Sequence, residues 1–235
     1  MDEHKALSQL QEIDSQVDVL DYREKNLPER NNYLRLKEEV SKIEGLYKAV
    51  SKKLHDEALV QKRLEDKLDI LSAKIDREQK RLYSGTIKNP KELASIQREL
   101  EHLKEQVDNI ETDLLGQIDV VDKLKSDSRV IEDRLASKRA ELDEAKSRME
   151  EVLADINDKR RFLQAKREPV YASLSEETRE LYNRVRIKQP LAVTVLEEGI
   201  CLGCRVELPS TEAERILSSL RLERCPNCSR VLVKV

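Results

Sequence analysis

The strongest hydrophobic pattern in the chain runs from Leu93 to Leu163, where apolar side chains recur at alternating steps of three and four residues. Of the 21 positions that this spacing defines, 17 are apolar, and the exceptions are Gln117, Ser128, Lys138 and Lys159. Such a heptad pattern is typical of a long helix whose apolar stripe packs against another helix in a left-handed coiled coil.

A second stripe with similar spacing runs from Leu36 to Leu82 and predicts the partner helix. Upstream, the apolar residues between Leu10 and Leu27 also follow helical spacing, but in a different phase, and Pro28 follows directly. Proline removes a helical hydrogen bond and clashes with the preceding turn. The sequence therefore predicts a kink or break between Asn26 and Leu36.

The two long stripes are separated by the segment LYSGTIKNPKEL, which carries signals for a chain reversal. Gly85 tolerates the positive φ that ends a helix, Asn89 is a good N-cap, and Pro90 suits the first helical position. Glu92 stands where a capping-box partner belongs. We therefore expect a turn over residues 83–90 and two antiparallel helices.

With the turn centred there, residue i of the first helix faces residue 175 − i of the second. Gln117 then lies near Glu57 and Gln61, in a polar layer that fixes the register of the helices at some cost in stability. Lys138 falls opposite residue 37, next to the predicted break. The matching lengths of the two stripes favour a hairpin within one chain over a parallel dimer.

Composition supports this fold class. Charged residues make up 39% of the 235 residues and aromatic residues only 3%, so large apolar side chains are too few for a thick globular core. The net charge of −3 gives no general electrostatic attraction to nucleic acid or to anionic membranes. The N-terminus is charged from residue 2 and no apolar run is long enough to span a membrane, so we expect a cytoplasmic protein.

The composition of the sequence changes after the apolar stripe that ends at Leu163. Pro169 is expected to end the coiled coil at Glu168, because proline pushes its predecessor out of helix. A short helix with Ser175 as its cap follows, and the segment from Leu191 onward is rich in β-forming residues. The predicted organisation is mostly α: a long antiparallel coiled-coil hairpin over residues 1–168, a helical connector over 169–190 and a small zinc-ribbon domain over 191–235.

The cysteines are the chemical signal in the chain. They form two CxxC pairs with 20 residues between them, made by Cys201, Cys204, Cys225 and Cys228. Two such knuckles complete a tetrahedron of thiolates with no open position, which predicts one structural zinc ion and not a catalytic one. The alternative, a redox CxxC, lacks the βαβ setting of a thioredoxin-like site. Zinc would also supply folding free energy that so small a module cannot draw from its core.

These motifs resemble those of a bacterial family of coiled-coil hairpins with a C-terminal C4-type zinc ribbon, the flagellar and sigma-factor-associated zinc ribbon chaperones. The turn motif is matched by Tyr83, Ser84, Gly85, Asn89, Pro90, Lys91, Glu92 and Leu93, with Gln97 and Glu99 in its continuation. The ribbon motif is matched by Glu198, Gly199, Cys201, Gly203, Cys204, Arg205, Leu208, Pro209, Arg224, Cys225, Pro226, Asn227, Cys228, Arg230 and Leu232. Ser229 departs from the glycine usual after the last cysteine, which predicts slight backbone strain.

The resemblance implies an adaptor or chaperone that binds an alternative RNA polymerase sigma factor and flagellar or type III secretion components. From the residues themselves, the first hypothesis is a non-enzymatic protein-interaction module. The second is a nucleic-acid-binding accessory factor that uses the ribbon and the basic segment 184–188. No constellation of reacting groups supports an enzyme.

We expect protein partners to bind at the ribbon end, where the N-terminal helix, the short helix and the zinc module converge. The junction is predicted to form a groove with apolar walls, made by Tyr171, Leu174, Leu181, Tyr182 and Val185. The exposed aromatic side chain of Tyr83 at the tip is the second candidate.

Overall fold

The structure, a computed structural model, describes residues 2–219 and 221–234. Helices account for most of the chain: α1 (Glu3–Lys25), α2 (Pro28–Tyr83), α3 (Pro90–Ala172), α4 (Glu176–Arg186) and α5 (Ser210–Ser218). The strands are short and all lie in the C-terminal part: β1 (Val193–Glu197), β2 (Ile200–Cys201), β3 (Val206–Glu207), β4 (Glu223–Arg224) and β5 (Val231–Val233). The predicted fold class, a long helical hairpin with a small C-terminal cysteine-bearing module, is confirmed.

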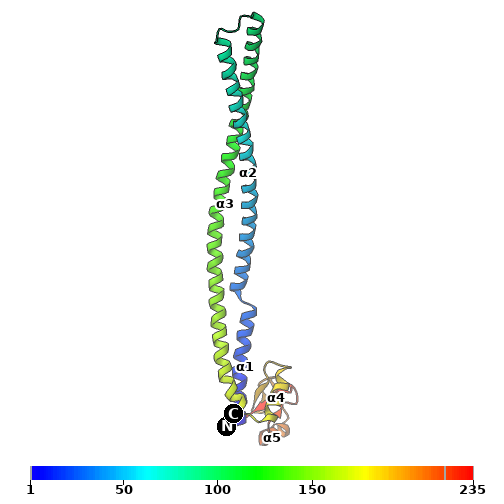
Figure 1. Cartoon of the computed structure of the whole chain (residues 1–235). Coiled ribbons are helices and arrows are strands. Elements are labelled where there is room, and N and C mark those ends of the chain that lie inside the picture. The colour runs from blue at the N-terminus through cyan, green and yellow to red at the C-terminus, as the bar shows by residue number, and fades with distance from the viewer. Residues whose placement is uncertain (1, 220, 235) are drawn as a thin grey trace. The chain divides into compact units, whose positions relative to one another are not determined.

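The chain forms two compact units. One comprises residues 32–145, and the other comprises residues 1–31 together with 146–235. In the first unit, α2 and the first part of α3 run antiparallel and side by side (Figure 1). In the second, α1 packs along the last part of α3 and carries α4 and the strands beside it.

The turn between α2 and α3 has the predicted chemistry. Gly85 has a φ of 71°, and the side-chain oxygen of Asn89 accepts a hydrogen bond from the Lys91 N–H at 3.0 Å, as an N-cap does. The predicted capping-box role of Glu92 gives way to another contact, because its carboxylate pairs with Arg81 of α2 at 3.0 Å. That ion pair joins the two helices at the turn.

The predicted seam is the buried face of α3. All 17 apolar seam residues are buried or half-buried, with Ile96, Leu103 and Val121 among the most buried. At the polar layer, Gln117 Nε2 donates to the Glu57 carboxylate at 2.7 Å and to its carbonyl oxygen at 3.1 Å, which confirms the predicted register. Farther from the turn, Lys138 Nζ lies 3.7 Å from Glu39, within one helical turn of the predicted level.

The helix break predicted between Asn26 and Leu36 is also confirmed. Helix α1 ends at Lys25, α2 starts at Pro28, and Leu27 between them is buried. The side-chain amide of Asn26 donates to the Tyr22 carbonyl at 2.9 Å and so satisfies the end of α1. Proline then opens α2 in its favoured first position, so the phase of the apolar stripe changes here.

The prediction that Pro169 ends the second helix is wrong, because α3 continues through it to Ala172. Proline costs one backbone hydrogen bond here, only three residues before the end of the helix. The extra turn places Val170 in a buried cluster with Leu7 and Leu10 of α1. Burial of these side chains offsets the lost bond.

The strands form one five-stranded sheet in the order β3-β2-β1-β5-β4. The central pair, β1 and β5, is parallel, with Val193 opposite Val231, while the outer pairs are antiparallel. From its sequence, the C-terminal part is also predicted to contain a short helix over residues 211–220 and a last strand over residues 231–235, and these correspond to α5 and β5. Leu220 and Val235 lie outside the described residues.

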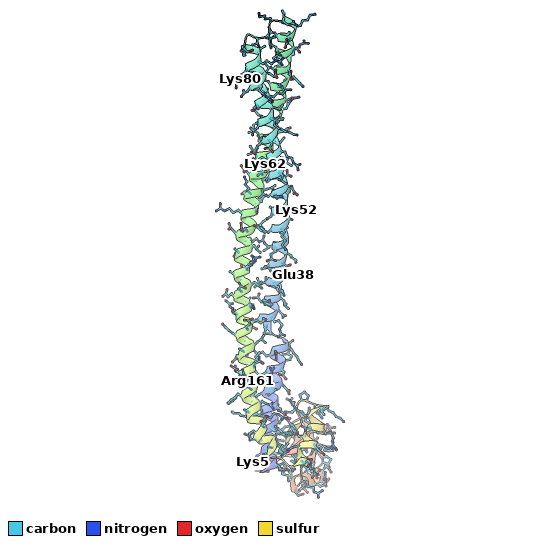
Figure 2. All side chains as sticks on the ribbon, in the orientation of Figure 1. Lys5, Glu38, Lys52, Lys62, Lys80 and Arg161 are labelled. Atoms are coloured by element: carbon cyan, nitrogen blue, oxygen red, sulfur yellow. The ribbon has the colours of Figure 1, made fainter. Side chains whose placement is uncertain are left out.

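The outer faces of the long helices carry charged side chains. Lys52, Lys62 and Lys80 project from α2, and Arg161 projects from α3 (Figure 2). Many of these charges pair one turn apart, and such exposed pairs add little to stability because solvent screens them. Among the described residues, none of the helices carries a stretch long and apolar enough to cross a bilayer.

Candidate metal centre

The first cysteine knuckle follows from the pairing of β2 with β1. Cys201 ends β2, and the chain turns so that the Arg205 N–H donates to the Cys201 carbonyl at 2.7 Å. Arg205 closes this turn in the left-handed region, with a φ of 58°. The turn brings Cys204 back toward Cys201.

The second knuckle repeats this geometry at the other side of the sheet. The Ser229 N–H donates to the Cys225 carbonyl at 2.8 Å, and Ser229 has a φ of 63°. This confirms the backbone strain predicted where serine replaces glycine. Because β1 and β5 join the two hairpins at the centre of the sheet, the two knuckles face each other.

The four sulfur atoms lie within 4.8 Å of one another and could hold a metal ion. Across the two knuckles, the Sγ atoms of Cys201 and Cys228 are 3.8 Å apart, and those of Cys204 and Cys225 are also 3.8 Å apart. A tetrahedral ion with metal–sulfur bonds of about 2.3 Å requires sulfur–sulfur distances of about 3.8 Å. All four cysteines are free thiols and two of their distances match this value, so the donor set fits a thiophilic cation.

Burial and hydrogen bonding act differently on the thiols. Burial raises the pKa of Cys201 to about 12 and also raises the pKa of Cys225. The side chain of Asn227 donates to the Cys204 sulfur and lowers the pKa of that thiol to about 6. A bound dication would favour the thiolate form at every position, because it places the largest local charge at the point where the sulfurs meet.

Arg230 connects the two halves of the centre. Its guanidinium donates to the carbonyl of Gly203 in the first knuckle at 2.9 Å and to the carbonyl of Leu191 at 2.8 Å. A Cβ atom at Gly203 would lie 2.8 Å from the Arg230 side chain and 3.1 Å from Thr194. The glycine is therefore required for this close approach.

A glutamine of α1 fixes the module to the helices. Gln11 is buried, and its Oε1 accepts hydrogen bonds from the N–H groups of Ala192 at 2.7 Å and Val193 at 3.0 Å. Its Nε2 donates to the Pro190 carbonyl at 3.2 Å and to Ser15 at 2.9 Å. One side chain thus accepts from two backbone N–H groups at the start of β1, while the Ala192 carbonyl there accepts from the Val231 N–H of β5 at 2.8 Å.

A buried ionic cluster next to Gln11 joins three helices. Asp14 of α1 accepts from Arg167 of α3 at 2.7 Å and from the Tyr182 hydroxyl of α4 at 2.6 Å. Arg186 of α4 pairs with Asp18 at 2.7 Å. Burial and the bond to Asp14 raise the pKa of Tyr182, so its hydroxyl stays a donor.

Glu3 completes the attachment at the start of α4. Its carboxylate accepts from the Ser175 N–H and from the Thr178 hydroxyl, both at 2.9 Å. The bond from Ser175 is the main reason that the pKa of Glu3 is lowered. The first turn of α1 is therefore tied to the first turn of α4.

The apolar groove predicted for partners is filled by the chain itself. Tyr182, Val185 and Leu174 are buried in the core that α1, α3, α4 and the sheet share, so they do not line an open surface. Leu181 and Tyr171 are half-buried at its edge, and the Tyr171 hydroxyl accepts from Asn183 at 2.7 Å. The groove prediction fails because the elements that converge here pack together and bury these apolar side chains in one shared core.

The tip residue Tyr83 is 83% exposed, at the end of α2. Its role in binding stays a prediction, as do those of Tyr171 and Leu181. Sequence reasoning missed Gln11, Asp14 and Glu3. For Gln11 and Asp14 the sequence offered a signal, because both are polar residues that adjoin the apolar stripe of α1 formed by Leu7, Leu10 and Ile13.

Fold and site together define a helical hairpin whose N-terminal helix carries a small four-cysteine module. Residues 10–190 match the CT398-like coiled coil hairpin domain, and the chain belongs to this family. The matched segment ends just before β1, so the four cysteines lie beyond it.

Relatives with similar sequences occur in mycobacteria. The chain is 26% identical over 235 residues to two Mycobacterium tuberculosis proteins, the uncharacterized proteins Rv2229c of strain H37Rv and MT2288 of strain CDC 1551. In both cases the match covers 99% of this chain and 96% of the relative. The sequence similarity thus extends over nearly the whole length of these relatives.

Solved structures agree with the fold. A Mycobacterium smegmatis protein superposes with a TM-score of 0.85 at 23% identity, covering 99% of this chain and 97% of the other. CT398 from Chlamydia trachomatis gives 0.70 at 17% identity, with 100% and 98% covered. HP0958 from Helicobacter pylori gives 0.51 at 18% identity, with 99% and 97% covered. At these identities the likeness establishes the fold alone.

Proposed function

We propose that the protein is a non-enzymatic adaptor or chaperone that binds protein partners, with one structural zinc ion in its four-cysteine module. The observation that carries this proposal is the closed donor set: the sulfurs pair at 3.8 Å across the knuckles, leaving a bound ion no open position for a substrate. A closed tetrahedron of thiolates is typical of structural zinc. Two CxxC pairs without disulfides also fit a reducing compartment, which supports a cytoplasmic location.

The zinc ion in this proposal acts through the fold. The module has a small apolar cluster, in which Leu196, Leu208, Ile216 and Leu232 surround the buried cysteines. Metal binding supplies folding free energy that such a cluster lacks. A folded module in turn presents the backbone of residues 190–193 to Gln11 and holds α4 against α1.

The partners follow from the family resemblance of the turn and ribbon motifs. They are an alternative RNA polymerase sigma factor and flagellar or type III secretion components. Contacts between α2 and α3 bury the apolar positions of the long seam, so these positions are not open to partners. This supports partner binding outside the hairpin core. Partners would therefore contact the exposed ends or outer faces of the molecule.

The test is direct binding of purified candidate partners to the full-length, zinc-loaded protein. We expect binding by the wild type, a loss of at least about tenfold in affinity for Cys225→Ser, and no loss for the tip variant Tyr83→Ala with Ile87→Ala. Both variants are checked for helicity. If only the tip variant loses binding, the turn is the binding end, and if neither candidate class binds, the proposed partners are wrong.

In the fold, one of the basic residues that the nucleic-acid alternative would use is already paired with a carboxylate. Arg186 is committed to Asp18 and lies near Asp14 at 3.8 Å, so it is not free to neutralise phosphate. A salt series decides between the two functions. Phosphate contacts by several basic side chains would make affinity fall steeply between about 50 and 200 mM salt, whereas partner binding through apolar contacts would not.

A further inference from the structure

The turn end of the hairpin is positively charged, in contrast to the chain as a whole. Residues 74–99 contain seven basic and four acidic side chains, which gives this segment a net charge of +3, whereas the whole chain has a net charge of −3. The neighbouring stretches of the two helices, residues 52–73 and 100–125, together carry eight basic and twelve acidic side chains, a net charge of −4. Positive charge is therefore confined to the turn end, where it attracts ligands of negative charge.

Two of the basic residues hold most of the carboxylates of this segment. Lys74 pairs with Glu99 at 2.9 Å. Arg81 pairs with Glu92 at 3.0 Å and lies 3.6 Å from Glu78. Within the part of the chain that the structure describes, the remaining basic side chains of the segment have no carboxylate partner: Arg77, Lys80, Lys88, Lys91 and Arg98. These cations are open to the carboxylates of another molecule.

An exposed aromatic side chain lies among these cations. Tyr83 is 83% exposed at the last position of α2. Arg77, Lys80 and Tyr83 follow one another at steps of three residues, so each is a surface neighbour of the next on the helix. Figure 2 shows Lys80 projecting from the turn end of α2. Ile87 in the turn is half-buried and adds a second apolar group.

Hydrogen bonds hold the turn itself in one conformation. The Ser84 hydroxyl donates to the Arg81 carbonyl at 2.8 Å and lies 2.7 Å from the Thr86 hydroxyl. The ion pair of Arg81 with Glu92 then joins α2 to α3. Because these contacts already order the turn, a partner that binds here has little backbone to immobilise.

We propose that this surface, the tip, binds an acidic segment of a protein that also carries apolar side chains. The tip comprises Arg77, Lys80, Tyr83, Ile87, Lys88 and Lys91. Carboxylates of the segment pair with the cations, and its apolar side chains pack on Tyr83 and Ile87. The charges steer the segment to the tip, while the aromatic ring provides the anchor. This contact is separate from the ribbon end and depends neither on zinc nor on the partners proposed above.

A short acidic segment fits this charge distribution better than a nucleic acid does. Tyr83 is the one aromatic residue in the segment 74–99, so successive bases would find no series of rings on which to stack. A longer strand would also extend from the tip along the neighbouring helices, whose net charge is negative and repels a polyanion. An acidic segment of a few residues ends within the positive tip.

The probe is a labelled peptide of three Glu-Glu-Leu repeats, titrated with the full-length protein and followed by fluorescence anisotropy. We expect a dissociation constant below about 200 µM for the wild type, raised at least about fivefold by Lys80→Ala with Lys88→Ala and about tenfold by Tyr83→Ala. The matched control is Lys52→Ala with Lys62→Ala, which removes two exposed lysines farther along α2 (Figure 2) and should bind as the wild type does. No binding by the wild type, no loss in Tyr83→Ala, or an equal loss in the control overturns the proposal.

Two further probes separate apolar contact from charge and a protein segment from a nucleic acid. The same peptide with serine in place of each leucine should bind at least about fivefold more weakly, because it has nothing to pack on Tyr83 and Ile87. An oligothymidylate of equal net charge should also bind more weakly than the leucine peptide. Equal binding of the serine peptide, or tighter binding of the oligonucleotide, contradicts the proposed occupant.

Discussion

At the scale of single residues, the buried side chain of Gln11 makes three hydrogen bonds to the backbone at the start of the module. Replacing it with alanine leaves the N–H groups of Ala192 and Val193 buried without an acceptor. We expect Gln11→Ala to lower the free energy of unfolding by about 1–3 kcal/mol, measured by chemical denaturation. Gln16→Ala, an exposed glutamine on the same helix, is the control and should change stability little. Equal effects of the two variants would show that the buried bonds are unimportant.

Two glycines allow a matched comparison between a position where an added methyl group meets close neighbours and one where it meets none. Gly203→Ala forces a methyl group against Arg230 and Thr194 and should lower stability by about 1–3 kcal/mol. Gly116→Ala meets no atom within 4 Å and lies inside α3, so it should raise stability by about 0.5–1 kcal/mol. Thermal denaturation of both variants gives the signs. If Gly203→Ala were neutral, the contact between Arg230 and the first knuckle would be loose.

Functional residues could be predicted from the sequence only where they stand at a fixed spacing. The four cysteines could be assigned because a CxxC knuckle brings both sulfurs to one point by local geometry. Gln11 has no such spacing, because its partners at the start of the module lie about 180 positions away. A contact of that range depends on the whole fold, so the sequence shows only a polar residue beside the apolar stripe of α1 and not what it binds.

At the scale of elements, periodicity predicted the hairpin well. The seam of α3 and the break at Pro28 follow from heptad phase, since burial in a two-helix coil is set by position along each helix. Two other predictions failed, namely that proline would end α3 before Pro169 and that residues of α4 would line an open groove. There, packing against α1 decides the structure: Val170 and Tyr182 are buried by a helix that is distant in sequence.

The polar layer gives a test of element pairing. Gln117→Leu together with Glu57→Leu converts the layer to an apolar one and should raise the midpoint of thermal unfolding, because a polar seam position lowers stability while fixing register. Gln97→Leu, on the exposed face of α3, is the control and should have little effect. A lowered midpoint for the double variant would mean that the Gln117–Glu57 bonds contribute more than apolar packing would.

At the scale of the whole molecule, two kinds of stabilisation act in different parts of the chain. The hairpin is held by its apolar seam, and the four-cysteine module is proposed to be held by metal. Removal of zinc with a chelator should therefore abolish the amide-exchange protection of the sheet, while circular dichroism retains most of the helical signal. A complete loss of helix on chelation would show that the seam between α2 and α3 does not stay folded without the module.

The central claim is that Cys201, Cys204, Cys225 and Cys228 together hold one zinc ion. The most direct measurement is the zinc content of the full-length protein purified without added metal, by plasma mass spectrometry, together with a thiol count after denaturation. The account predicts one zinc ion per chain and four free thiols, and a loss of bound zinc in Cys225→Ser. Protein without zinc, or with two disulfides in place of the thiols, would contradict it.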